Sequence, residues 1–293
     1  MEFPLSPDKS TSLVRFWNGG IIQITQHVRR MRGGAQAHLM QAEDGHFYVV
    51  KFQNNPQHRR VLANELLASR LATLLGLPVP AAEIVEVTPW LVANTPELSI
   101  QLSQRAIPCA AGLQFGSRYV VDPLADAVQV FDFLPEAMGG RVKNLASFAG
   151  ILAFDKWTGN ANGRQAAFWK RARDRKYTVA FIDQGYCFNA GEWSFADSPL
   201  RGVYARNHVY TGITGWDSFE PWLSGIETFS QSSIAAIADE IPTEWYGDPD
   251  DLKRLIEQLW SRRSRVRELL DAFRLSSRQP FPNWGHALAA QAP

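Results

Sequence analysis

Four polar residues of this chain have the types and the order that transfer of a phosphoryl group requires. Lys51 closes a strand-like apolar run, Asp155 and Asn160 stand five residues apart, and Asp183 follows a second apolar run. Phosphoryl transfer needs a cation against the phosphates, ligands for divalent metal ions and a group that orients the attacking hydroxyl. These four side chains can supply those parts, in the order in which ATP-dependent phosphotransferases carry them.

Lys51 lies between two apolar residues, Val50 and Phe52. In a strand its side chain therefore points to the opposite face from theirs, where an ammonium group can hold the oxygens of ATP. The alternative is an exposed lysine on an edge strand. Glu65 favours the first interpretation, because it lies in the next helical run and a strand lysine paired with a helix glutamate is how kinases fix that lysine. A solvated helix face remains the alternative for Glu65.

A short glycine-containing turn precedes the strand hairpin of Lys51. It consists of Gly33, Gly34, Ala35 and Gln36. Unhindered backbone N–H groups in such a turn can approach phosphate oxygens. The turn fits neither the GxGxxG nor the GxxxxGK[ST] pattern, so an ordinary turn is the alternative.

The spacing of Asp155 and Asn160 matches the D-x4-N step of kinase catalytic loops. The carboxylate could orient the acceptor hydroxyl as a base, and the amide oxygen could bind Mg²⁺. Asp183 is the expected second metal ligand. The alternatives are an Asp at a helix C-terminus, an Asn in a turn and an ordinary strand-terminal Asp.

Periodic apolar residues indicate the elements that must position these side chains. Leucines at helical spacing predict a helix over residues 57–75, and Asn144 is expected to cap a helix that delivers Asp155 into the following loop. A long amphipathic helix is predicted over residues 249–273. Strands are predicted over residues 21–25, 37–42, 47–53, 83–87 and 177–183, with one more strand in the loop-rich stretch 88–111.

The composition describes a globular protein with room for two modest domains. Of 293 residues 45% are apolar, and the net charge is +1, so direct binding to nucleic acid is not expected. The N-terminus lacks a signal-peptide pattern, and no run approaches eighteen apolar residues. We therefore expect a cytosolic protein without membrane insertion.

Other kinds of functional site find little support in the sequence. The six histidines show no HExxH pattern, and Cys109 and Cys187 lack CxxC spacing, so a zinc site is not expected and both cysteines are interpreted as plain thiols. The absence of a GxSxG motif disfavours a hydrolase. Basic residues between 253 and 267 alternate with acidic ones, which favours a solvated helix face over a surface for RNA or membranes.

Five short segments together resemble the HipA-like kinases, especially their compact stand-alone branch, over residues 20–210. The segments are Gly34-Ala35-Gln36, Val49-Val50-Lys51-Phe52, Ala63-Asn64-Glu65, Phe154-Asp155 through Asn160, and Ile182-Asp183-Gln184-Gly185. The resemblance implies an α+β, bilobal protein-kinase-like fold, with a β-rich N-lobe over residues 1–115 and a larger helical C-lobe over residues 116–293. It also implies ATP in the cleft between the lobes and serine/threonine kinase activity.

By position, the resemblance gives each matching residue a role. Lys51 would hold the ATP phosphates, Asp155 would be the catalytic base, and Asn160 and Asp183 would bind Mg²⁺. Phe115 and Gly116 would lie in the strand and hinge near adenine.

Two departures from the family pattern limit what is inherited. Many relatives have aspartate where this chain has Asn162, which brings no charge. The long N-terminal region of classical HipA toxins is also missing, so neither toxin function nor an antitoxin-like partner follows automatically.

The sequence thus predicts an ATP- and Mg²⁺-dependent serine/threonine protein kinase whose acceptor is unknown. Two alternatives stay open. One is a small-molecule or lipid kinase on the same fold, and the other is a nucleotide-binding pseudokinase that acts by protein contact.

Overall fold

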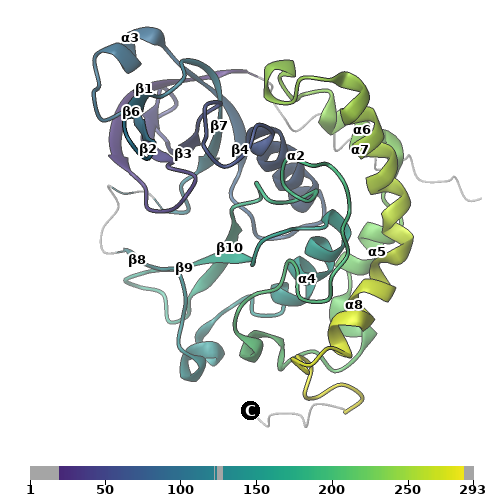
Figure 1. Ribbon diagram of the computed structural model, residues 1–293. Coiled ribbons are helices and arrows are strands. Elements are labelled where there is room, and N and C mark those ends of the chain that lie inside the picture. The colour runs from purple at the N-terminus through teal and green to yellow at the C-terminus, as the bar shows by residue number, and fades with distance from the viewer. Residues whose placement is uncertain (1–19, 122, 124–127, 287–293) are drawn as a thin grey trace, which may run out of the picture.

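The computed structural model describes residues 20–121, 123 and 128–286 (Figure 1). Five strands close into a barrel in the spatial order β1-β2-β3-β7-β4. Their bounds are β1 Ile22–Arg30, β2 His38–Ala42, β3 Phe47–Lys51, β4 Ala82–Val87 and β7 Gly112–Arg118. Neighbouring strands are antiparallel, except that β1 and β4 pair in parallel at the closing edge.

The barrel has an apolar interior because alternate residues of each strand point inward. In β3 the inward residues are Tyr48 and Val50, which belong to the buried cluster of the barrel. Phe47, Val49 and Lys51 of the same strand therefore face outward. This alternation confirms the prediction that Lys51 points away from its apolar neighbour Val50.

One buried histidine, His38, lies in the barrel wall with none of its surface exposed. Its Nδ1 lies 3.0 Å from His27 Nε2, and its Nε2 lies 3.8 Å from Cys109 Sγ. Burial is the main reason why the pKa of His38 falls from 6.5 to about 4, and the neighbouring His27 adds to the fall. Both cysteines are buried free thiols, as predicted.

We expect His38 to make the protein less stable in acid. Its folded-state pKa lies below the unfolded value, so its contribution is complete above pH 6.5 and is lost as pH falls towards 4. At pH 5 the loss is about 2 kcal/mol. Urea unfolding at pH 7.5 and 5.0 should show a smaller pH difference for His38→Gln than for the parent. His46→Gln, on the exposed β2–β3 turn, is the matched control; equal pH differences for both variants would contradict this expectation.

Helix α2, Val61–Leu74, packs against the barrel and faces the helical part of the molecule (Figure 1). Residues 61–72 are all buried, which is why the helix is apolar around most of its circumference. It starts four residues later than predicted, because residues 52–60 form a loop. Gly76, with a φ of 68°, follows its end as expected.

The stretch between β4 and β7 contains more structure than the sequence predicts. It forms helix α3 and a two-stranded hairpin. Their bounds are α3 Pro89–Ala93, β5 Ser99–Gln101 and β6 Ala106–Pro108. The 3₁₀ helix η2, Glu136–Arg141, follows strand β8, Val128–Phe131, later in the chain.

A second sheet and a group of helices make up the rest of the described chain. The sheet has the order β10-β9-β8, with antiparallel pairs. The strands are β8 Val128–Phe131, β9 Gln165–Arg171 and β10 Thr178–Ile182, and the α-helices are α4 Ser147–Thr158, α5 Trp222–Glu227, α6 Gln231–Ala238, α7 Pro249–Arg262 and α8 Val266–Arg274. Four short 3₁₀ helices complete this part: η3 Asn207–Tyr210, η4 Trp216–Phe219, η5 Thr243–Trp245 and η6 Arg263–Arg265.

Other details of the sequence-based expectation also differ from the structure. The single helix expected over residues 249–273 is two helices, α7 and α8, with η6 between them. Asn144 does not cap α4, because its side chain instead bonds the backbone N–H and C=O of Val179, each at 2.9 Å. Strand β7 runs to Arg118 and so crosses the division expected after residue 115. Among the helices of the described residues, none is long and apolar enough to cross a bilayer.

Candidate active site

Lys51, Glu65 and Asp183 meet where β3, α2 and the end of β10 come together. Lys51 Nζ forms ion pairs with Glu65 Oε1 and with Asp183 Oδ1, the latter at 2.6 Å. Glu65 also accepts the backbone N–H groups of Gln184 and Gly185, each at 2.9 Å. The predicted pairing of the strand lysine with the helix glutamate is therefore present, and Glu65 ties α2 to the segment that carries Asp183.

Burial and charge act against each other in this cluster. Burial alone would lower the pKa of Lys51, but the carboxylates of Glu65 and Asp183 raise it above its ordinary value. Burial raises the pKa of Asp183, and the Lys51 ammonium outweighs that effect and holds it below its ordinary value. Lys51 therefore stays a cation and Asp183 an anion at neutral pH. These are the charge states that contact with phosphates and a metal ion needs.

Asn64 fixes the segment that follows Asp183. Its amide group donates to the carbonyl oxygens of Gly185, Cys187 and Ala190 at 2.8 to 2.9 Å. Its Oδ1 accepts a hydrogen bond from the indole N–H of Trp193 at 2.7 Å. Residues 185–193 are thus held against the side of α2 next to Glu65.

Gln165 is a site residue that the sequence reasoning missed. It opens β9, and its Nε2 donates to Asp183 Oδ2 at 2.7 Å. Asp183 itself has a left-handed backbone, with a φ of 62°. The signal that could have found Gln165 is its place directly after the turn-rich run 159–163, where a strand begins opposite the end of another.

The structure contradicts the prediction that Asp155 lies in the loop after a buried helix. Asp155 belongs to α4, and its side chain has no exposed surface. Arg164 binds both carboxylate oxygens, with Nε donating to Oδ2 at 2.8 Å and Nη2 to Oδ1. A carboxylate held in this way has no access for an acceptor hydroxyl. In this conformation Asp155 is paired with Arg164, and its role as catalytic base stays a prediction.

Asn160 is also buried, and the metal-binding role predicted for it stays a prediction. Only 1% of its surface is exposed. Its Nδ2 donates to Asp155 Oδ1 at 3.0 Å, and its Oδ1 accepts the backbone N–H of Asn162 at 3.0 Å. The five-residue step between the two residues therefore builds a turn and not a pair of open ligands.

Arg164 was not singled out in the sequence, although it organises this region. Besides Asp155 it donates to the carbonyl of Ile182 at 3.0 Å and to Gln184 Oε1 at 2.7 Å. Burial alone would lower its pKa, but Asp155 raises it above the ordinary value. Through Arg164, helix α4 fixes the residues on both sides of Asp183.

The residues predicted to approach phosphates form the loop between β1 and β2. Gly33 has a φ of 116°, a conformation that favours glycine. The carbonyl of Ala35 accepts a bond from Asn55 at 2.9 Å, and a Cβ at Gly34 would lie 3.5 Å from Gln57. The loop is thus packed on residues 52–60, and its contact with phosphates stays a prediction.

Phe115 and Gly116 differ in their relation to Lys51. Phe115 is the cross-strand partner of Lys51 and shares its outward face. A Cβ at Gly116 would lie 2.7 Å from Val85 Cγ1 inside the barrel, so Gly116 faces the barrel interior. Of the two residues expected near adenine, only Phe115 points to the side of Lys51.

The second sheet packs one face on the helical core and turns the other away from it. In β9 and β10 the alternate residues Ala166, Phe168, Val179 and Phe181 belong to the buried helical core. Their neighbours Gln165, Ala167, Trp169, Ala180 and Ile182 therefore point to the other face. A cavity of about 400 Å³ joins this face to the rim of the barrel, lined among others by Phe47, Tyr119, Val128 and Trp169.

A second cavity, of about 290 Å³, has Gln165 in its lining. It is lined by Asp132, Phe133, Arg164, Gln165, Ala166, Ile182, Tyr204, Ala205 and Arg206. Asp132 is an exposed carboxylate there, and the Arg206 guanidinium lies 4.7 Å above the Phe133 ring. This cavity therefore offers both charges and an aromatic face next to the Asp183 cluster.

The donors beside Lys51 fit a metal ion that a bound phosphate also holds. The described residues contain no group of three or more His, Cys, Asp or Glu side chains that could bind a metal ion by themselves. Asp183 supplies a carboxylate and Gln165 an amide beside it. Mg²⁺ is commonly bound by one or two carboxylates together with substrate phosphates, so this donor set fits such a use.

Comparison with known families decides which group of proteins this chain is part of. A family profile described as HipA-like kinase matches residues 21–275. The chain belongs to the HipA-like kinase family. It is accordingly a kinase, an enzyme of phosphoryl transfer, and the resemblance inferred from its motifs is confirmed.

Solved structures place this HipA-like kinase among kinase folds of mixed α and β content. The Golgi casein kinase with Mn/ADP bound matches with a TM-score of 0.52 and 12% identity, covering 92% of this chain and 77% of that one. The Helicobacter pylori proinflammatory kinase CtkA matches with 0.53 and 14%, covering 88% and 99%. Hydra Fam20 with sugar matches with 0.51 and 14%, covering 89% and 88%. No curated protein matches the sequence.

Proposed function

We propose that this HipA-like kinase transfers the γ-phosphate of ATP to a serine or threonine hydroxyl of a protein, with Mg²⁺ as the metal. The observation that carries the proposal is the assembled cluster of Lys51, Glu65 and Asp183. A lysine that contacts phosphates and an aspartate that holds the metal ion are both required for phosphoryl transfer. Lys51 and Asp183 are the residues that would take these two roles in this chain.

The nucleotide would lie between two lobes, the barrel with α2 and the helical part with its sheet. The outward face of β3 carries Val49 and Lys51, and the facing sheet carries the small residues Ala167 and Ala180. Small residues leave room for a flat base. The loop of Gly33 and Gly34 would cover the phosphates from the barrel side.

Asp183 and Gln165 would hold the metal ion together with the phosphates. The solved Golgi casein kinase was crystallised with Mn/ADP, which supports a divalent metal and a nucleotide for this fold. When bound, the ion would neutralise charge on the phosphates. Lys51 would offset the remaining charge, and Glu65 would keep Lys51 in position.

The cavity beside Gln165 is the candidate acceptor site. Asp132 is its exposed carboxylate, and Asp155 beneath it is closed off by Arg164. Incubation with γ-labelled ATP, followed by separation of a lysate into protein and lipid fractions, tests the acceptor class. Label in the protein fraction is expected. Label confined to lipid or to small molecules would contradict a protein kinase but not a kinase.

A nucleotide-binding pseudokinase is the second candidate, and one observation favours it. Loop residues 159–165 carry no carboxylate, because Asn162 stands where many relatives have aspartate. Melting temperature and ATP turnover, each with and without Mg²⁺, separate the two functions. A kinase should melt higher with Mg·ATP and consume it, whereas a pseudokinase should show the first effect alone. If neither occurs, both candidates fail.

We expect Asn162→Asp to increase turnover. Asn162 is exposed on the loop that precedes Gln165, so a carboxylate there can reach solvent and an acceptor. General-base catalysis contributes about 10²- to 10⁴-fold, and a gain of at least about tenfold is expected from a carboxylate added without further adjustment. Asn207→Asp, on the 3₁₀ helix η3, is the control for a change of charge alone. An unchanged or reduced rate for Asn162→Asp would show that this loop does not supply the base.

The biological setting inferred from the sequence stays a prediction. It comprises the cytosolic location and an antitoxin-like partner.

A further inference from the structure

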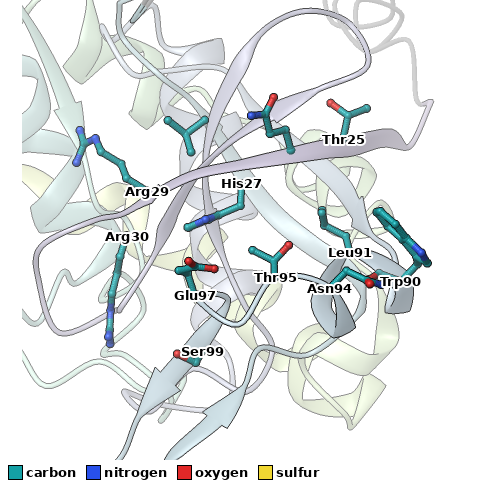
Figure 2. Close-up of a pocket in the computed structure, with 12 residues that line it drawn as sticks. Thr25, His27, Arg29, Arg30, Trp90, Leu91, Asn94, Thr95, Glu97 and Ser99 are labelled. Atoms are coloured by element: carbon teal, nitrogen blue, oxygen red, sulfur yellow. The ribbon is translucent and has the colours of Figure 1, made fainter.

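A groove runs along the outside of the barrel, away from the Lys51 cluster. It has a volume of about 800 Å³. We call it the β1 groove; its lining is Thr25, Gln26, His27, Val28, Arg29 and Arg30 of β1, with Trp90, Leu91, Asn94, Thr95, Glu97 and Ser99 opposite (Figure 2). Nothing in the proposed phosphoryl transfer uses these residues.

The β1 groove lies against the edge of a strand and not against one of its faces. Successive side chains of a strand point to opposite faces, so a cavity on one face is lined by every second residue. Here six consecutive residues, 25–30, line the groove. Strand pairing agrees, because β1 pairs with β4 only at Ile22 and Gln23 and beyond them pairs with β2 alone among the described strands.

The free edge of β1 is therefore a template for another strand. Unpaired N–H and C=O groups at a sheet edge can bond an extended segment that lies alongside. Two register shifts, between Ile24 and Gln26 and between His27 and Arg29, each place one extra residue in β1 relative to β2. The opposite edge of β1 has no partner among the described strands beyond Gln23. With a rise of about 3.3 Å per residue, the edge matches a segment of about six residues.

The side chains at the two ends of the β1 groove indicate what such a segment should contain. Figure 2 shows Arg29 and Arg30 at one end and Trp90 at the other. Arg29 is exposed and has no ion pair among the described residues, whereas Glu97 faces His27 in the middle. The groove thus has an excess of positive charge at one end. Trp90 is 70% exposed, and tryptophan is enriched among residues that dominate binding at interfaces.

We propose that the β1 groove binds an extended acidic peptide segment of a partner protein, added as a strand to the edge of β1. Acidic side chains of the segment lie against Arg29 and Arg30, and an apolar side chain packs on Trp90. Backbone hydrogen bonds to residues 25–30 supply affinity that does not depend on the peptide sequence. The side chains at the two ends of the groove select which peptide sequences bind. The proposal does not depend on catalysis, so it can fail while the proposed function holds.

The β1 groove is connected to the loop of residues 31–36. Arg30 donates to Gln36 Oε1, and Gln36 also bonds the backbone of Gln101 in β5, accepting from its N–H at 2.7 Å and donating to its C=O at 2.8 Å. The wall of the groove and the loop predicted to cover the phosphates are therefore joined by the hydrogen bond from Arg30 to Gln36. A segment bound beside Arg30 lies next to that loop.

The test begins with an unbiased probe, a displayed library of random nine-residue peptides selected on the full chain. Peptides that also bind the double variant Arg29→Glu, Trp90→Ala are removed. We expect the remaining sequences to be acidic with one large apolar residue. A synthetic copy of the most enriched peptide should bind at least tenfold more weakly to each single variant, and should slow hydrogen exchange of the amides in residues 25–30. N-methylation of alternate peptide residues should abolish binding.

The controls use matched surface residues away from the groove. Arg254→Glu and Trp260→Ala, both on α7, should leave binding unchanged, and all variants should keep the parent melting temperature. Failure to enrich any sequence, enrichment of basic sequences, or binding that tolerates N-methylation would overturn the proposal. A dimer of this chain that dissociates on Arg29→Glu would also overturn it, by assigning the groove to a second copy.

Discussion

Replacing Asp183 by asparagine is expected to lower ATP turnover by about a thousandfold, the size of effect seen when one preorganised electrostatic group is removed. The Asp183 carboxylate lies 2.6 Å from Lys51 Nζ, and Gln165 bonds its second oxygen. An asparagine keeps this shape but removes the charge that a metal ion needs. Lys51 keeps its ion pair with Glu65, so the fold should survive.

Single-turnover measurements with saturating Mg·ATP check this expectation. Asp239→Asn, at the exposed C-terminal end of α6, is the matched control and should keep the parent rate. A melting-temperature shift with Mg·ATP that is smaller for Asp183→Asn than for the parent would place the loss at metal and nucleotide binding. If Asp183→Asn keeps more than a tenth of the parent turnover, Asp183 is not the metal ligand.

The part of the site that the sequence predicts well is the part built by short-range geometry. Alternation along β3 places Lys51 opposite its apolar neighbour, and helical spacing places Glu65 outside the leucine stripe of α2. Asp183 follows directly from the end of β10. Each of these positions depends on a few neighbouring residues, so a single sequence contains enough information to find it.

The part that failed depends on where a helix ends and on a distant partner. Helix α4 continues to Thr158 because Gly159, with a φ of 60°, ends it one turn beyond Asp155. That extra turn moves Asp155 from the expected loop into the core. The partner that then satisfies its charge is Arg164, which no local spacing marks. Burial and long-range ion pairing are properties of the fold, and the D-x4-N spacing alone cannot distinguish a buried pair from an open one.

Surface features, too, depend on long-range pairing that local sequence spacing does not show. The sequence predicts an irregular connection over residues 88–111. In the structure, two hydrogen bonds between the Gln36 side chain and the Gln101 backbone join residues 65 positions apart. Similarly, the free edge of β1 exists because β4 pairs with only its first two residues. Such features arise from which strands are neighbours, and amphipathic patterns do not encode that.

Breaking the pair of Arg164 and Asp155 is expected to destabilise the protein severely, which separates a structural carboxylate from a catalytic base. Arg164→Met leaves the Asp155 carboxylate buried and without its counter-charge, at a cost of about 3–5 kcal/mol in unfolding free energy. Asp155→Asn should also destabilise, because it leaves the buried Arg164 cation unpaired. If Asp155 were instead a catalytic base with a free carboxylate, Asp155→Asn would lower the activity of the enzyme with little change in its stability.

A double-mutant cycle in urea, measured at pH 7.5, distinguishes these outcomes. The cycle comprises Asp155→Leu alone, Arg164→Met alone and the variant with both. The double variant removes both charges, and replacing a whole buried ion pair by apolar residues is far less costly than removing one partner. We therefore expect the double variant to be more stable than either single one, with a coupling energy of about 2–3 kcal/mol. Arg254→Met, which breaks an exposed pair with Asp251, should cost less than about 1 kcal/mol. Additive losses in the cycle would mean that Asp155 and Arg164 do not act as a pair, and the catalytic role of Asp155 would have to be reconsidered in a conformation that frees its carboxylate.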